Sequence, residues 1–290
     1  MPNLLEPFSY EFFSRGLLAA VLAGGLCGLV GVYVVLRHMS YIGHGLSHSI
    51  FGGAVLGYVL HLNFYIAASV WGVLSALLIN ETVRRRRIGA DAAIGIVTTA
   101  SFALGVAIIS HARQFTTNFE AALFGNVLGV SREDLLVVAA TALGCGLVVL
   151  LAYKPLLFAT FDPEVAEVYG VPTAWMDALL ALVLAATIVA AMQVLGVTLI
   201  AAALVIPAVI ARQLTHSFGW MMLLSTTVGA LCGAIGIYLS YFFDVASGAT
   251  VVLVAAGLFV LSGLYADLRR ARRQRARAQP RQQGAPAPLD

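Results

Sequence analysis

The first apolar segment of the chain, residues 15–36, reads RGLLAAVLAGGLCGLVGVYVVL. No charged residue follows Arg15 within it, and as a helix it is long enough to cross a hydrocarbon core of about 30 Å. The whole chain shares this character, because 60% of its 290 residues are hydrophobic and only 11% are charged. A soluble domain carries about 25% charged residues. The sequence therefore predicts an all-α, polytopic bundle of transmembrane helices.

Further apolar segments of this kind follow along the chain, and together they predict the membrane spans. The expected spans are residues 15–36, 44–60, 64–80, 92–110, 134–152, 175–195, 198–212, 220–242 and 249–266. Because the second and the seventh are short, eight spans is the alternative to nine. The apolar run 175–211 is too long for one helix, and Gly196 lies where this run would have to turn or break.

Glycines recur four residues apart in several spans, as in Gly24 with Gly28 and Gly229 with Gly233. Small residues at this spacing let helix backbones approach one another closely. They predict a tightly packed bundle and say nothing about a substrate.

Clusters of arginine indicate which side of the membrane faces the cytoplasm. Arg84–Arg87 follow the third span, and seven arginines between residues 269 and 281 follow the last. Because cytoplasmic loops carry an excess of basic residues, we expect the C-terminus inside and, with nine spans, the N-terminus outside. Residues 267–290 are rich in Arg, Gln, Ala and Pro. We therefore expect a mostly disordered cytoplasmic tail that touches anionic membrane lipid rather than nucleic acid.

A short helix is predicted at residues 163–169, in the loop after the fifth span. Asp162 is a good N-cap, Pro163 suits the first helical position, and Glu164 complements the positive end of the helix dipole. Gly170 is a natural C-terminal stop. The apolar face of this helix is formed by Val165, Val168 and Tyr169. We interpret it as a cytoplasmic helix that docks into a groove on a partner protein, the alternative being a loop helix that rests on the bilayer surface.

Two histidines, His44 and His48, stand four residues apart in the second expected span. Residues four apart share one face of a helix, so both imidazoles can point at the same spot. Two neutral imidazoles form half of a transition-metal site, and ionisable groups inside a membrane are costly enough to indicate a function. The alternative is a pair of packed histidines that bond to neighbouring backbone carbonyls. The remaining metal ligands are not identified by the sequence.

Several blocks of the sequence are more specific together than any one of them is alone. They include residues 31–48, 91–97, 161–172, 196–208 and 244–248. In this order the blocks resemble an ABC-transporter permease of the zinc/manganese/iron-type metal-import family. The resemblance implies a fold like that of the vitamin B12 importer, with residues 1–266 as the permease domain and residues 162–170 as its coupling helix.

The same resemblance implies a set of partners. A permease of this family works as a homodimer with two ATPase subunits and an extracytoplasmic metal-binding protein, in the inner membrane of a bacterium. It transports Zn²⁺ or Mn²⁺ and holds no permanent cofactor. The sequence contains no G-x-x-x-x-G-K-[ST] phosphate loop, so ATP must be hydrolysed by another chain and this chain is expected not to be an enzyme.

Position 44 departs from the family pattern. Where the family commonly has an aspartate, this chain has His44. An imidazole in place of a hard carboxylate shifts the site toward borderline metals, which slightly favours zinc over manganese.

Three other functions stay open. A permease of the same architecture could carry a metal chelate such as a siderophore, which predicts a roomier path without clustered imidazoles. An intramembrane zinc protease would need the general-base Glu of H-E-x-x-H, but this chain has Gly45 at that position. A scaffold protein is disfavoured by histidines inside the membrane.

Overall fold

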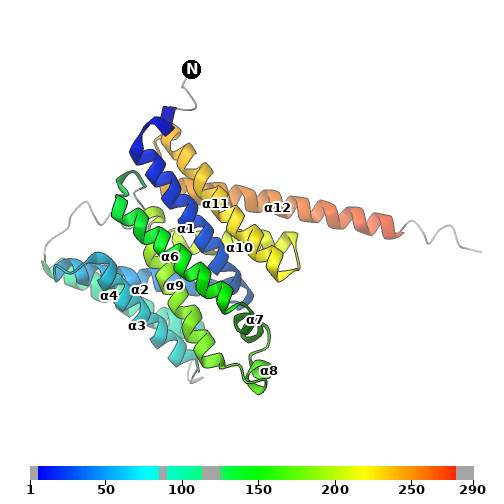
Figure 1. The fold of residues 1–290 in the computed structure, drawn as a ribbon, viewed down its shortest axis with the longest axis horizontal. Helices are drawn as coiled ribbons and strands as arrows, with labels where there is room; N and C mark the ends of the chain where they lie inside the picture. The colour runs from blue at the N-terminus through cyan, green and yellow to red at the C-terminus, as the bar shows by residue number, and fades with distance from the viewer. Residues whose placement is uncertain (1–5, 85–89, 113–124, 126, 279–290) are drawn as a thin grey trace, which may run out of the picture.

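A computed structural model describes residues 6–84, 90–112, 125 and 127–278 of the chain. Every expected span is a helix in the structure, and the described residues contain no strand. The nine long helices are α1 (Glu11–Leu36), α2 (Ser40–Val59), α3 (Phe64–Arg84), α4 (Ala90–Ala112), α6 (Arg132–Leu151), α9 (Thr173–Leu195), α10 (Ile200–Leu214), α11 (Phe218–Phe243) and α12 (Ser247–Ala278). The short ones are η1 (Glu6–Ser9), η2 (Val127–Gly129), α7 (Tyr153–Phe161) and α8 (Pro163–Val168). The prediction of an all-α bundle is confirmed (Figure 1).

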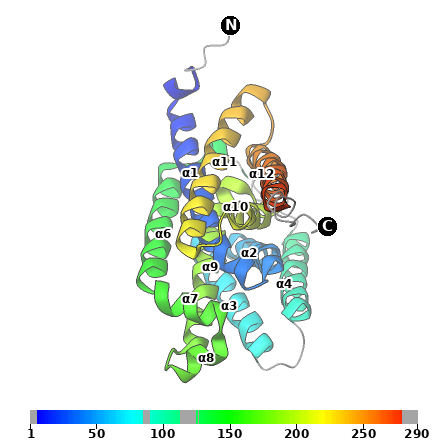
Figure 2. The same ribbon diagram turned by 90° about the vertical axis from the view of Figure 1, so that its right-hand side faces the viewer.

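Seven of the long helices are long and apolar enough to cross a membrane, and α2 and α10 are not among them. The chain breaks between α9 and α10 at Gly196, as predicted, because this glycine adopts a φ of 78° that other residues rarely adopt. The break leaves α10 with only 15 residues. Instead of crossing alone, α10 packs against α1, α11 and α12, while α2 packs against α3 and α4 (Figure 2). The expected eight or nine spans therefore consist of seven helices that are long and apolar enough to cross alone, and of α2 and α10, which are held in the bundle by contacts with neighbouring helices.

Helix α1 packs along α11 through the predicted glycine contacts. A Cβ atom added to Gly24 would collide with the backbone carbonyl of Gly229, and one added to Gly229 would collide with that of Gly24. Gly28 approaches the carbonyl of Ser225 in the same way. The Ser225 hydroxyl donates a hydrogen bond to the Gly28 carbonyl at 2.5 Å across this interface. Close backbone approach of this kind lets dispersion contacts hold helices together where lipid supplies no hydrophobic drive.

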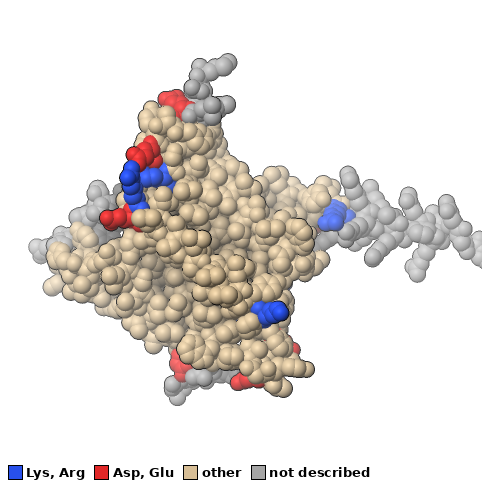
Figure 3. All heavy atoms as spheres, in the orientation of Figure 1, with Lys and Arg blue, Asp and Glu red and all other residues tan. Residues whose placement is uncertain are grey.

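The two ends of the bundle are defined by contacts between distant parts of the chain. At the N-terminal end, Glu11 of α1 pairs with Arg132 of α6 at 2.6 Å. At the opposite end, which we call the α8 end, Arg37 pairs with Asp177 of α9, and the ring of Tyr153 lies 5.5 Å from that of Phe218. On the face shown in Figure 3, charged side chains lie near these two ends and far along α12, and the surface between them is uncharged.

Helix α12 corrects the expected start of the disordered tail. The helix continues to Ala278, so residues 268–278 are helical, and its second half projects away from the bundle (Figure 1). Alanine and arginine are both strong helix formers, which explains a helix without an apolar face. Residues 279–290 and Arg85–Arg87 lie outside the described residues.

Candidate functional site

Helix α2 is enclosed by its neighbours on all sides but one. From residue 42 to residue 55, every residue is buried except His44 and His48. Tyr41, one turn before His44, extends this open stripe and is 53% exposed. The two histidines therefore share one face, as their spacing predicted, and this face is the accessible side of an otherwise buried helix.

The two imidazoles lie against each other. Their ring centroids are 4.5 Å apart and their planes meet at 84°. The ring of Tyr41 lies 5.7 Å from that of His44, and the ring of Phe102, on α4, lies 5.3 Å from that of His48. Thr98 and Thr99 of α4 complete the wall of a recess of about 220 Å³. The recess thus offers two imidazoles beside neutral hydroxyl groups and aromatic rings.

The contacts of His48 argue against a purely packing role for this side chain. Its Nδ1 atom is buried and makes no hydrogen bond within the described part of the chain. A packed histidine usually has a backbone carbonyl or another acceptor for its ring N–H. Within the described residues, this ring nitrogen therefore keeps its hydrogen-bonding capacity unused.

A third metal ligand is absent from the described residues of this protomer. No group of three or more His, Cys, Asp or Glu side chains lies together in residues 6–84, 90–112 and 127–278. A divalent transition metal takes four or more ligands. The His44–His48 pair is therefore half of a site at most.

The corner before α2 fixes where the histidines lie. Helix α1 ends at Leu36, and His38 adopts a left-handed φ of 55°. The Met39 N–H donates to the Val34 carbonyl at 3.0 Å and the His38 N–H to the Val35 carbonyl at 3.2 Å. This is the hydrogen-bond pattern of a Schellman cap. The corner starts α2 at Ser40, so His44 and His48 lie about one and two turns into it.

The predicted cytoplasmic helix is present as α8, Pro163–Val168, one residue shorter than expected. The Asp162 carboxylate accepts a hydrogen bond from the Val165 N–H at 3.0 Å, and Gly170 leaves the helix with a φ of 82°. The expected apolar face is open, with Val168 85% and Tyr169 77% exposed. Its caps thus match the prediction, and α8 forms a protruding corner of the molecule (Figure 1).

Sequence reasoning missed two features beside α8. Helix α7 occupies residues read as part of a loop, because Pro155 and Lys154 suggest an irregular segment although proline is tolerated in a first helical turn. The Arg37 side chain also escaped notice. It pairs with Asp177 and donates from Nε to the Thr160 hydroxyl at 3.1 Å, although these partners are 140 and 123 residues away in sequence.

Comparison with known proteins places these features in a family context. The sequence profile described as the ABC 3 transport family matches residues 9–266. The chain is 41% identical over 254 residues to the manganese transport system membrane protein MntC of Halalkalibacterium halodurans, covering 88% of this chain and 87% of that protein. It is 36% identical to the manganese import system permease protein ScaB of Streptococcus parasanguinis, covering 90% and 93%. It is also 35% identical to a probable iron transport system membrane protein of Haemophilus influenzae, covering 92% and 98%.

Two solved structures share the arrangement of helices. PsaBC from Streptococcus pneumoniae, solved in complex with Fab, superposes with a TM-score of 0.82 at 34% identity, covering 89% of this chain and 94% of that chain. An inward-facing ABC transporter described as of the metal-chelate type superposes with a TM-score of 0.65 at 17% identity, covering 87% and 85%. The second shows a common fold alone.

Proposed function

Since the chain belongs to the ABC 3 transport family, we propose that it is the membrane-spanning permease subunit of an ATP-driven importer of divalent first-row metal ions. The observation that carries this proposal is the open stripe of α2, where two adjacent imidazoles are the accessible side chains of an otherwise buried helix. Placing two imidazoles on such a face is costly in a membrane unless they serve a transported ion.

Manganese is the first candidate for the transported ion. The relatives MntC and ScaB are named as manganese transporters, and an iron-type relative matches almost as well. This support outweighs the slight preference for zinc that two imidazoles gave. Because His44 is an imidazole rather than the carboxylate that manganese prefers, we expect this protein to discriminate less sharply against zinc.

A second copy of the chain completes the proposed path. The histidine stripe lies beside Tyr41, which is 53% exposed, and beside Phe102 of α4. Lipid covering this face would leave the imidazoles without polar partners, whereas a two-fold related copy brings its own His44 and His48. Together the two pairs would supply four ligands, two of which one protomer lacks.

Each end of the bundle is assigned to one of the remaining partners, the ATPase subunit and the extracytoplasmic metal-binding protein. We assign the α8 end to the cytoplasm, because the run Arg84–Arg87 follows α3, whose last turns lie beside Arg37 and Asp177 at that end, and α8 docks the ATPase subunit. The N-terminal end then faces outward and receives metal from an extracytoplasmic binding protein. The arginines that follow the apolar part of α12 favour the cytoplasmic side for the C-terminus as well, where they would meet anionic lipid.

Transport by the reconstituted complex tests this function. The permease, purified with its ATPase subunit and placed in proteoliposomes with the metal-binding protein, should accumulate radiolabelled Mn²⁺ only when ATP is supplied. Excess Zn²⁺ or Fe²⁺ should compete for uptake, and a ferric siderophore should not. Uptake of the ferric chelate without uptake of the free ions would instead assign the chain to chelate transport.

A further inference from the structure

We propose that Arg37 is the positioning residue that links the coupling helix to the metal-binding helix. Arg37 closes α1 just before the corner that starts α2. Its guanidinium bonds to the hydroxyl of Thr160 and to the carboxylate of Asp177. This inference rests on the proposed function. It describes how a movement of α8 during ATP hydrolysis would be transmitted to His44 and His48.

The two partners of Arg37 flank α8 on either side. Thr160 is in the last turn of α7, two residues before the N-cap Asp162. Asp177 is in the first turns of α9, which begins at Thr173 after the short connection from α8. A movement of α8 therefore displaces both hydrogen-bond partners of the Arg37 guanidinium. The movement is transmitted to Arg37 through α7 as well as through α9.

The contact is enclosed enough to transmit such a movement. The Arg37 side chain is 12% exposed, while that of Asp177 is 39% exposed. The Arg37 Nη2 atom is buried without a hydrogen-bond partner in the described residues. The guanidinium therefore has one unused donor that can form a hydrogen bond when α7 and α9 shift relative to α1. Charge-assisted hydrogen bonds of low exposure are stronger and more directional than surface pairs.

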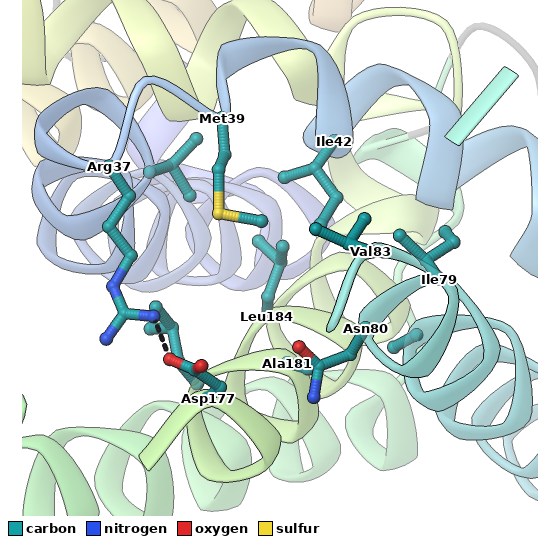
Figure 4. A pocket seen from close by; sticks show the side chains of 12 residues that line it. Arg37, Met39, Ile42, Ile79, Asn80, Val83, Asp177, Ala181 and Leu184 are labelled. Atoms are coloured by element: carbon teal, nitrogen blue, oxygen red, sulfur yellow. Dashed lines mark hydrogen bonds and ion pairs between the residues drawn. The ribbon is translucent and has the colours of Figure 1, made fainter. Parts of the chain in front are cut away.

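The start of α2 borders a small pocket beside Arg37. This pocket, of about 50 Å³, lies between the α1–α2 corner, α3 and α9 (Figure 4). Met39 and Ile42 line it from the start of α2, and Asn80 and Val83 line it from α3. Because α2 is one unbroken helix from Ser40 to Val59, a tilt at this corner carries His44 and His48 with it.

The sharpest test uses two substitutions at one position. Thr160→Val keeps the shape of the side chain and removes the oxygen that accepts from Arg37 Nε, whereas Thr160→Ser keeps that oxygen. Asp177→Asn removes the negative charge of the ion pair and so weakens the second contact of Arg37 independently. Arg132→Gln removes the exposed ion pair with Glu11 at the other end of the molecule and serves as a control.

The measured quantity is the number of Mn²⁺ ions transported per ATP hydrolysed by the complex in proteoliposomes. In Thr160→Val and Asp177→Asn this ratio should fall by about fivefold or more, the lower range for energetic coupling between sites. Assembly with the ATPase and the affinity of the detergent-solubilised permease for Mn²⁺ should stay unchanged. Thr160→Ser and Arg132→Gln should keep the ratio of the parent protein.

The outcomes separate this inference from the proposed function. A parent complex that transports Mn²⁺, together with Thr160→Val and Asp177→Asn variants of unchanged ratio, overturns the role of Arg37 alone. A fall in ratio that also occurs in Thr160→Ser or Arg132→Gln overturns it as well. A parent complex that transports no metal overturns the proposed function itself.

Discussion

The imidazole of His44 stands with its ring centroid 4.5 Å from that of His48, and the two ring planes are nearly perpendicular. A metal ion binds to a ring nitrogen of a neutral imidazole. The geometry therefore presents two ready ligands and no carboxylate to neutralise the ion. Under the proposed function, a site of imidazoles without a carboxylate would bind the ion weakly enough to release it during transport.

Breaking the cap of α8 should uncouple the ATPase. Val165→Pro removes the N–H that donates to the Asp162 carboxylate. We expect the variant to insert normally and to lose metal-stimulated ATP hydrolysis by about tenfold, because loss of the cap and the non-helical bias that proline imposes on Glu164 together cost over 1 kcal/mol. The measurement is ATPase activity of the complex with and without metal-loaded binding protein. Asp162→Asn keeps the acceptor and is the control. Wild-type stimulation in the proline variant would show that α8 does not dock the ATPase.

The close approach of α1 and α11 should tolerate no side chain at Gly24. Gly24→Val would press a branched side chain against the backbone of Gly229, and overpacking of this kind costs about 1–3 kcal/mol. Gly144→Ala on α6, where nothing lies within 4 Å of the added atom, should instead be neutral or stabilising. Thermal unfolding of the two variants in detergent compares them directly. Equal midpoints would mean that the helices are not packed as described.

The left-handed corner at His38 should accept glycine and resist a branched residue. A non-glycine residue in this conformation costs about 1–2 kcal/mol, so His38→Gly should leave stability unchanged or raise it slightly. His38→Val should lower it, since branched side chains fit this region least. Unfolding midpoints in detergent measure both. A more stable valine variant would contradict the Schellman cap between α1 and α2.

The arginine-rich end of α12 should be dispensable for transport. The Ser262 hydroxyl donates to Gln213 of α10 at 2.8 Å, whereas the helix beyond residue 268 projects away from the bundle (Figure 1). Truncation after residue 268 should preserve Mn²⁺ uptake at matched membrane levels. Lost uptake in a normally inserted truncation would mean that this segment contacts a partner.

Local patterns in the sequence predicted the features that depend on neighbouring residues. The break at Gly196, the caps of α8 and the shared face of His44 and His48 follow from backbone preferences and helical spacing, and the structure has all three. The end of α12 was misjudged because its residues lack apolar periodicity but have high helix propensity.

Features that join distant segments could not be read in this way. No local pattern indicates the partners of Arg37, because its side chain meets Thr160 and Asp177 across more than a hundred residues of sequence. The enclosure of α2 likewise depends on α3 and α4 and gives no local signal. Tertiary packing, rather than any motif, leaves the two histidines as the open stripe of α2.

The most direct test of the metal path is uptake of radiolabelled Mn²⁺ and Zn²⁺ by His44→Ala, His48→Ala and His44→Asp variants at matched expression. Both alanine variants should lose transport of either ion. His44→Asp should keep transport and shift preference toward Mn²⁺, because a carboxylate suits the harder ion. His111→Ala, which removes an exposed histidine at the end of α4, is the control and should transport like the parent. If both alanine variants at positions 44 and 48 also transport like the parent, the histidines are packing residues and the metal passes elsewhere.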